Sequence, residues 1–349
     1  CYNYRRIYTC YNSKIGGYNM TDYKAIFGKK IKFQTSDLTM STATEGELFY
    51  SDTSSEFKVG VTLEAWASGE NMGTARSGFN GQAYGTIDSS LASGGSAATK
   101  VVTTEEYDGT DWTSGGNMNT ARNQMAGFGL QTAAVAVGGQ LGPTNQSQAT
   151  EEYNGSSWTS VTNTPQHRYT AAGAGILTAG VVFGGQTAPG GDPGSATNTN
   201  VTLEYDGTNW TSGGNLGTAT QRRGGAGTQT AALAISGTAP TANVEEYDGS
   251  SWTEGPNVNT ARGNAGASGI TTSALFFGGY PNIAHSETYD GSSWTEGPNL
   301  GTARYGMVGA GASNTSALAA GGGAGAPSSV TNATEEFQGI VTLKTVTDS

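Results

Sequence analysis

The sequence predicts an all-β protein: a six-bladed β-propeller of four-stranded antiparallel blades, preceded by a small N-terminal β module. Six tryptophans recur at spacings of 46, 46, 52, 42 and 42 residues, at Trp66, Trp112, Trp158, Trp210, Trp252 and Trp294. A period of about 40 to 50 residues is typical of propeller and array repeats. Turn signals divide each period into short strand-like runs, and no stretch keeps the 3.6-residue spacing of an amphipathic helix.

The second repeat shows how four strands arise. A Gly/Ala-rich stretch (125–129) and an apolar run (133–137) form the first two, and a polar loop leads to the third. Asn154-Gly155 then precedes Trp158, which opens the fourth strand. This pair predicts a primed hairpin turn, because Asn and Gly reach positive φ at little cost. One small sheet cannot bury both faces, so the blades are expected to stack radially.

Three further features recur with the tryptophan, and together they resemble the kelch repeat. Diglycines follow the second strand at Gly94-Gly95, Gly138-Gly139, Gly184-Gly185, Gly278-Gly279 and Gly321-Gly322, with Ser236-Gly237 in the fourth repeat. An aromatic residue ends the third strand at Tyr107, Tyr153, Tyr205, Tyr247, Tyr289 and Phe337. An arginine lies ten residues after the tryptophan at Arg76, Arg122, Arg168, Arg262 and Arg304; the fourth repeat has Thr220 there, with Arg222-Arg223 just beyond. Because they recur in register, the tryptophans and arginines are predicted to be structural.

The ring is predicted to close through both ends of the repeat region. The segment 61–66 carries Trp66 without a preceding strand of its own, so it is expected to join the last repeat at 335–346. Which of the two segments lies outermost stays open. The domains are therefore residues 1–19 as a leader, 20–60 as an N-terminal module and 61–349 as the propeller.

The first 60 residues differ from the repeats. Codons for Gly16-Gly17 before Met20 can spell a bacterial ribosome-binding sequence, so residues 1–19 are expected to be translated upstream DNA; a genuine N-terminal segment is the alternative. Residues 47–59 predict a hairpin, and the 20–60 module resembles short N-terminal modules of tailed-phage fibre and appendage proteins. The repeats also resemble kelch-like proteins of marine tailed phages. This implies a location on the virion surface, with other virion proteins as partners through residues 20–60.

Charge and hydropathy restrict the partners. Residues 1–60 carry a net charge of +2 and residues 61–349 carry −13. Phosphates would be repelled by the acidic repeats, which argues against nucleic acid. No apolar run approaches the length of about 18 residues that a membrane-spanning helix needs, so membrane insertion is not expected. Both cysteines, Cys1 and Cys10, precede the propeller.

Catalytic patterns are weak. Pairs such as Glu151-Glu152 recur, but neighbouring residues of a strand point to opposite faces, so the two carboxylates cannot converge. One Glu of each pair is expected to meet the repeat arginine, and the other to be solvated. His167 and His285 are isolated, and no copper-ligand set exists. We therefore expect no catalytic residue, metal or cofactor, and no enzymatic activity.

The loops between second and third strands differ sharply and share one face with the inter-blade connections. Such loops on a repeated scaffold favour recognition. The candidate ligand-binding residues on this face are Asn145, Asp192, Tyr280, Asn282 and His285. We expect a non-enzymatic phage virion or appendage protein that binds a host-surface glycan or protein there, with homo-oligomers as a further option. The alternatives are a purely structural capsid or tail decoration protein and a polysaccharide-degrading enzyme.

Overall fold

The computed structural model of the chain describes residues 23–26, 29–34, 48–51, 53–79, 82–142, 145–188, 193–238, 241–324 and 329–345. Six four-stranded antiparallel blades form the predicted β-propeller. From first to fourth strand they are: blade 1, β5 (Gln82–Thr86), β6 (Ser89–Ser93), β7 (Thr104–Tyr107), β8 (Trp112–Ser114); blade 2, β9 (Ala126–Leu130), β10 (Ala133–Val137), β13 (Thr150–Tyr153), β14 (Trp158–Val161); blade 3, β15 (Ala172–Ile176), β16 (Ala179–Phe183), β19 (Thr202–Tyr205), β20 (Trp210–Ser212); blade 4, β21 (Gly224–Thr228), β22 (Ala231–Ile235), β23 (Val244–Tyr247), β24 (Trp252–Gly255); blade 5, β25 (Gly266–Ile270), β26 (Ser273–Phe277), β27 (Ser286–Tyr289), β28 (Trp294–Gly297); blade 6, β29 (Val308–Ser313), β30 (Ser316–Ala320), β31 (Thr334–Thr345), β4 (Glu56–Gly69).

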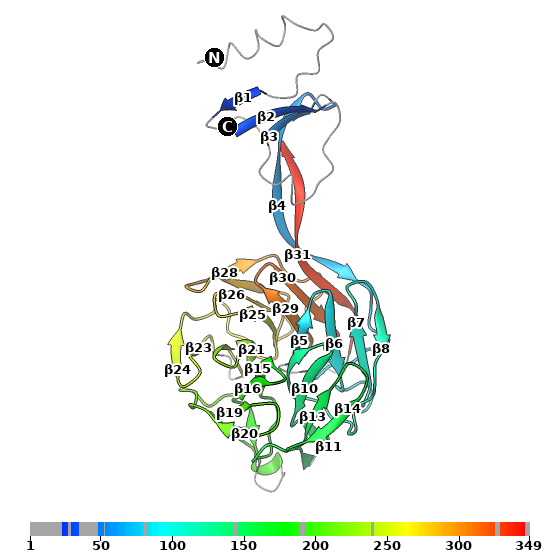
Figure 1. Ribbon diagram of the computed structural model, residues 1–349, viewed down its shortest axis with the longest axis vertical. Helices are drawn as coiled ribbons and strands as arrows, with labels where there is room; N and C mark the ends of the chain where they lie inside the picture. Colours follow the sequence, from blue (N-terminus) through cyan, green and yellow to red (C-terminus); the bar gives the residue numbers. More distant parts are fainter. Residues whose placement is uncertain are drawn as a thin grey trace, which may run out of the picture. The chain divides into compact units, whose positions relative to one another are not determined.

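The first strand of each blade lies near the propeller axis and the fourth lies at the rim, as β21 and β24 illustrate in Figure 1. Six strands fit around one axis because their residues are mostly glycine and alanine. A Cβ on Gly225 would lie 2.6 Å from the carbonyl oxygen of Gly173 in the preceding blade. Between blades 1 and 2 the approach is close enough for β5 and β9 to pair in parallel.

The ring closes in blade 6, where the two ends of the repeat region meet. The sheet order β29-β30-β31-β4 makes β4 the outermost strand, which settles the point that the sequence left open. The Trp66 ring on β4 lies 5.2 Å from the ring of Phe337 on β31 and 4.9 Å from Phe277 of blade 5. Aromatic contacts therefore join the first and last repeat segments to each other and to the neighbouring blade.

Contacts divide the chain into two compact units, Glu64–Gln338 and a second unit made of Cys1–Leu63 with Gly339–Ser349. The second unit contains β1 (Tyr23–Ile26), β2 (Lys29–Gln34) and β3 (Leu48–Ser51). The predicted hairpin is confirmed, since β3 pairs antiparallel with the start of β4 from Leu48↔Val59 to Ser51↔Glu56. β31 runs for twelve residues, where other third strands have four, so that its last part belongs to the second unit. The predicted leader, residues 1–19, lies outside the described residues.

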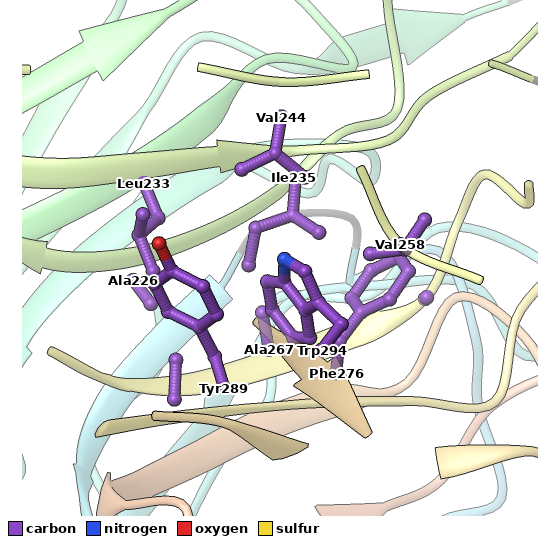
Figure 2. Close-up of a cluster of buried hydrophobic side chains, with 11 residues drawn as sticks. Ala226, Leu233, Ile235, Val244, Val258, Ala267, Phe276, Tyr289 and Trp294 are labelled. Carbon is purple, nitrogen blue, oxygen red and sulfur yellow. The ribbon is translucent and has the colours of Figure 1, made fainter. Parts of the chain in front are cut away.

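Each tryptophan packs between its own blade and the preceding one. Figure 2 shows the Trp294 indole beside Tyr289 and Phe276, with Ile235 and Val244 of blade 4 on its nitrogen-bearing side. The Tyr289 and Trp294 rings are stacked at 4.8 Å. The buried cluster that surrounds the Trp294 ring agrees with the prediction that the tryptophans are structural, and it places this one in a core shared by two blades.

The strand order defines two faces. The repeat face is formed by the turns between first and second strands, two residues each, and, in blades 1 to 5, by the turns between third and fourth strands, four residues each. The primed hairpin turn predicted at Asn154-Gly155 is wrong, because residues 154–157 and the equivalent residues 248–251 form four-residue turns. In residues 248–251, Asp248 Oδ1 accepts the backbone N–H groups of Ser250 and Ser251, and only Gly249 has positive φ. Such a four-residue turn is held by its aspartate side chain.

The opposite face, here named the variable face, carries the loops between second and third strands and the inter-blade connections. These loops range from eight residues (236–243) to eighteen (184–201). Blades 2 and 3 decorate theirs with short elements, namely β11 (Gln140–Gly142), β12 (Asn145–Gln146), β17 (Gln186–Thr187), β18 (Thr197–Asn198) and the 3₁₀ turn η3 (Pro193–Ser195). The structural variation between blades is therefore concentrated on this face.

Candidate functional site

The residues proposed from the sequence fall into two separate places on the variable face. Asn145 is exposed on β12 in blade 2. Tyr280, Asn282 and His285 share one loop of blade 5, where Tyr280 is 58 % exposed and its ring meets that of Tyr305 edge-on at 5.8 Å. Blades 2 and 5 stand on opposite sides of a six-membered ring, so the structure does not bring Asn145 to the blade 5 group. Asp192 lies outside the described residues.

A closed ring of backbone hydrogen bonds surrounds the axis on the variable face. Each blade contributes one residue that donates its N–H to the carbonyl of the preceding blade's residue, at N···O distances of 2.6 to 3.0 Å. The six residues, two positions after each repeat arginine position, are Gly78, Gln124, Thr170, Arg222, Asn264 and Gly306. All six have φ between 55° and 79°, four of them without being glycine. Six blades thus share one cyclic hydrogen-bond network, and its side chains sit where the loops meet.

The repeat arginines are structural, as predicted. Arg122 is fully buried, and its Nη1 donates to the carbonyls of Gly138 and Ala149 while Nη2 pairs with Glu151 at 2.9 Å. The other Glu151 oxygen accepts the backbone N–H of Asn119. The same arrangement recurs in the pairs Arg76–Glu105, Arg262–Glu287 and Arg304–Glu335. These arginines therefore tie the inter-blade connection to the third strand, and they are not free to bind a ligand.

In blade 4 the buried guanidinium comes from a different sequence position. With Thr220 at the usual place, Arg223 provides the guanidinium and pairs with Glu245 at 2.9 Å. Arg223 stands three residues later, where other blades have apolar residues such as Met125 and Met307. The adjacent arginine, Arg222, is thereby left for the axial ring.

Blade 3 keeps its arginine without a carboxylate. Arg168 is 1 % exposed and donates from Nη1 to the carbonyls of Gly184 and Val201, but Nη2 and Nε have no partner among the described residues. Leu203 takes the place of the glutamate, and Pro165 takes the place of the residue whose N–H that glutamate would accept. Burial lowers the pKa of Arg168 to about 10.

The second glutamate of each pair corrects an expectation. It was expected to be solvated, but it accepts a hydrogen bond from the tyrosine of the next blade: Tyr205 donates to Glu152 at 2.6 Å and Tyr289 to Glu246 at 2.6 Å. Tyr153 donates to Glu106 in the same way. Between blades 5 and 6 both partners change together, to Thr288 and Phe337. These glutamates connect neighbouring blades.

A cavity of about 240 Å³ opens on the axis at the other end, the repeat face. The ends of all six first strands line it with glycine and alanine, and with the half-exposed side chains of Leu130, Ile176 and Ile270. Of the residues proposed from the sequence, none that the structure describes lines it. The turns on this face are uniform, so variation among loops could not indicate a cavity there. The sequence feature that accompanies the cavity is the alternation of glycine with an apolar residue at the ends of these strands.

Metal and membrane signatures were also searched within the described ranges. No group of three or more His, Cys, Asp or Glu side chains there is arranged to hold a metal ion. Within the same part of the chain, no helix is long and apolar enough to cross a membrane.

Comparison with known proteins gives a likeness in fold. No protein-family model matches the chain, and no curated protein matches it. Among solved structures, that of YjhT is similar with a TM-score of 0.64 and 14 % sequence identity, covering 78 % of this chain and 99 % of that one. At this identity the likeness shows a shared fold, and the chain has the architecture of a six-bladed β-propeller.

Proposed function

We propose that this kelch-like chain is a non-enzymatic virion or appendage protein of a tailed phage, and that its variable face binds a host-surface glycan or protein. The N-terminal module, residues 20–60, would attach it to other virion proteins. The observation that carries the proposal is the unequal use of the two faces: turns of fixed length on one, and loops of eight to eighteen residues on the other.

The distinctive side chains of the repeat support a scaffold role. The repeat arginines, the paired glutamates and the tryptophans are engaged in contacts within and between blades, as Arg122, Glu152 and Trp294 illustrate. The loops of the variable face hold the exposed Tyr280 and His285. Many copies on one particle would make weak contacts effective through avidity.

Three experiments test this function. Proteomics of purified particles is expected to find the chain, and antibodies against the propeller are expected to label the particle surface. Labelled full chain is expected to bind host cells, and replacement of residues 280–285 by Gly/Ser is expected to reduce that binding. Turnover of a cell-surface polysaccharide by the intact chain, or binding that depends on the repeat face, would contradict the proposal.

A further inference from the structure

Charges divide between the two faces of the propeller. The turns of the repeat face carry six aspartates and no Lys or Arg: Asp88, Asp108, Asp111, Asp206, Asp248 and Asp290. Among the described residues, the loops and connections of the variable face carry Lys100, both histidines and all seven arginines of the propeller, against Glu70 as the one acidic residue. Asp192 lies outside the described residues. An acidic protein thus presents one face that is not acidic.

Most of those arginines are committed to structure, and Arg222 is the exception. Five form buried ion pairs, and Arg168 is buried. Arg222 is only half-buried, and its side chain has no hydrogen bond or ion pair with any residue that the structure describes. Its backbone is fixed in the axial ring, donating to Thr170 O at 2.8 Å and accepting from Asn264 N at 3.0 Å. Arg222 therefore carries a partly desolvated guanidinium, without a counter-ion among the described residues, on a backbone fixed at the centre of the variable face.

The surroundings of Arg222 fit a sugar that bears an anionic group. Two further ring residues, Asn264 next to Arg222 and Gln124 two places away, carry side-chain amides that make no hydrogen bond with the described residues. Gly78 and Gly306 contribute no side chain to the ring, and the hydroxyl of the remaining ring residue, Thr170, donates to Tyr169 O and Gln221 Oε1. The Tyr305 ring adjoins Gly306 and meets the exposed Tyr280, which gives an aromatic surface of the kind on which sugar rings stack.

We propose that Arg222 is the anion-recognition residue of the variable face and that the ligand is an acidic glycan, bound through a carboxylate. This rests on the proposed recognition function and names its ligand class. The guanidinium would donate two parallel hydrogen bonds to the carboxylate, a geometry that suits arginine and is stronger than neutral hydrogen bonding. The amides of the axial ring would bind sugar hydroxyls.

The test compares two variants with the same change in net charge. Arg222→Gln removes the cation and copies Gln124, which occupies the equivalent ring position with φ 55°. Asn209→Asp also changes the charge by −1, but on the repeat face, where blade 1 already has Asp111 at the equivalent turn position. Both variants therefore use residues that this scaffold accepts, and thermal unfolding checks that each is folded.

Full-length protein would be applied to an array of neutral, carboxylated (oligogalacturonate among them) and sulfated oligosaccharides. The expected result is binding to carboxylated members, retained by Asn209→Asp and weakened at least tenfold by Arg222→Gln. Binding confined to neutral or sulfated sugars, or equal binding by both variants, overturns the inference and leaves glycan recognition standing. If no glycan binds, the inference also fails, and cell binding by the wild type then decides whether the recognition function itself survives.

Discussion

Replacing Arg122 by methionine is expected to destabilise the protein far more than replacing Arg168 by methionine, although both side chains are buried at equivalent positions. Without Arg122, Glu151 stays buried with only a backbone N–H as partner. Breaking a buried pair in this way costs about 3–5 kcal/mol.

Arg168 has no glutamate partner that its removal would leave buried and unpaired. Its removal leaves the carbonyls of Gly184 and Val201 without the guanidinium, a cost of about 1–3 kcal/mol for a buried group left unsatisfied. It also removes an uncompensated buried cation, whose desolvation penalty amounts to several kcal/mol. The two effects oppose each other, so the free energy of unfolding of Arg168→Met is expected to be within about 1 kcal/mol of the wild-type value.

Urea denaturation followed by tryptophan fluorescence measures both variants, and equal denaturant slopes show that the same surface unfolds in each. The reasoning predicts a gap of at least about 2 kcal/mol between them. Equal losses would refute it, since they would mean that Arg168 has a counter-charge. As a companion test, Leu203→Glu is expected to stabilise the protein when it is made in the wild-type background, where Arg168 is present. It is not expected to do so in the Arg168→Met background.

Three other predictions follow from particular contacts. Trp252 Nε1 donates to Thr202 Oγ1 at 2.8 Å, whereas Trp294 Nε1 faces Val244 and has no partner among the residues that the structure describes. Val244→Thr is therefore expected to stabilise the protein by about 1 kcal/mol and Thr202→Val to destabilise it by about 1–3 kcal/mol, measured by urea denaturation. Burial and the hydrogen bond to Glu106 raise the pKa of Tyr153 to about 12. Because an unfolded tyrosine loses its proton near pH 10, stability is expected to fall as pH rises from about 10 to 12, and less steeply in Tyr153→Phe; an unchanged slope between the two proteins would contradict this. Finally, Gly/Ser replacement of residues 280–285 is expected to lower cell binding without lowering the urea midpoint by more than the Asn209→Asp control does.

The repeat made the fold predictable, because local signals and the period agree in every unit. The tryptophan spacing predicted the number of blades, and the in-register arginines were predicted to be structural and to meet one glutamate of each pair. Closure by the segment around Trp66 also followed from strand counting. The order of the closing strands did not, because β4 and β31 have similar sequence patterns and only their pairing separates them.

Departures from the repeat were visible in the sequence. Their structural role could not be predicted, because it depends on which groups each side chain can reach in the folded protein. Arg223 compensates for Thr220 only because a guanidinium three residues farther on still arrives at Glu245. Leu203 and Pro165 lie far apart in the sequence, and only the structure shows that they remove two parts of one interaction. The glutamates that bind the next blade's tyrosine were missed for the same reason, since a pattern within one repeat says nothing about the register between repeats.

The candidate site was predicted in part. Loop variation pointed to the variable face and to Tyr280 and His285, which are indeed exposed there. Arg222 was noted only as a departure from the repeat. Its importance follows from the axial ring, which depends on six residues with left-handed backbone and has no residue-type signature, as the series from Gly78 to Arg222 shows.

An experimental density map of the full chain with bound oligogalacturonate tests the account most directly. The account predicts sugar density on the variable face, with a carboxylate within hydrogen-bond distance of the Arg222 guanidinium. Density instead in the cavity of the repeat face, beside Leu130, Ile176 and Ile270, would contradict it.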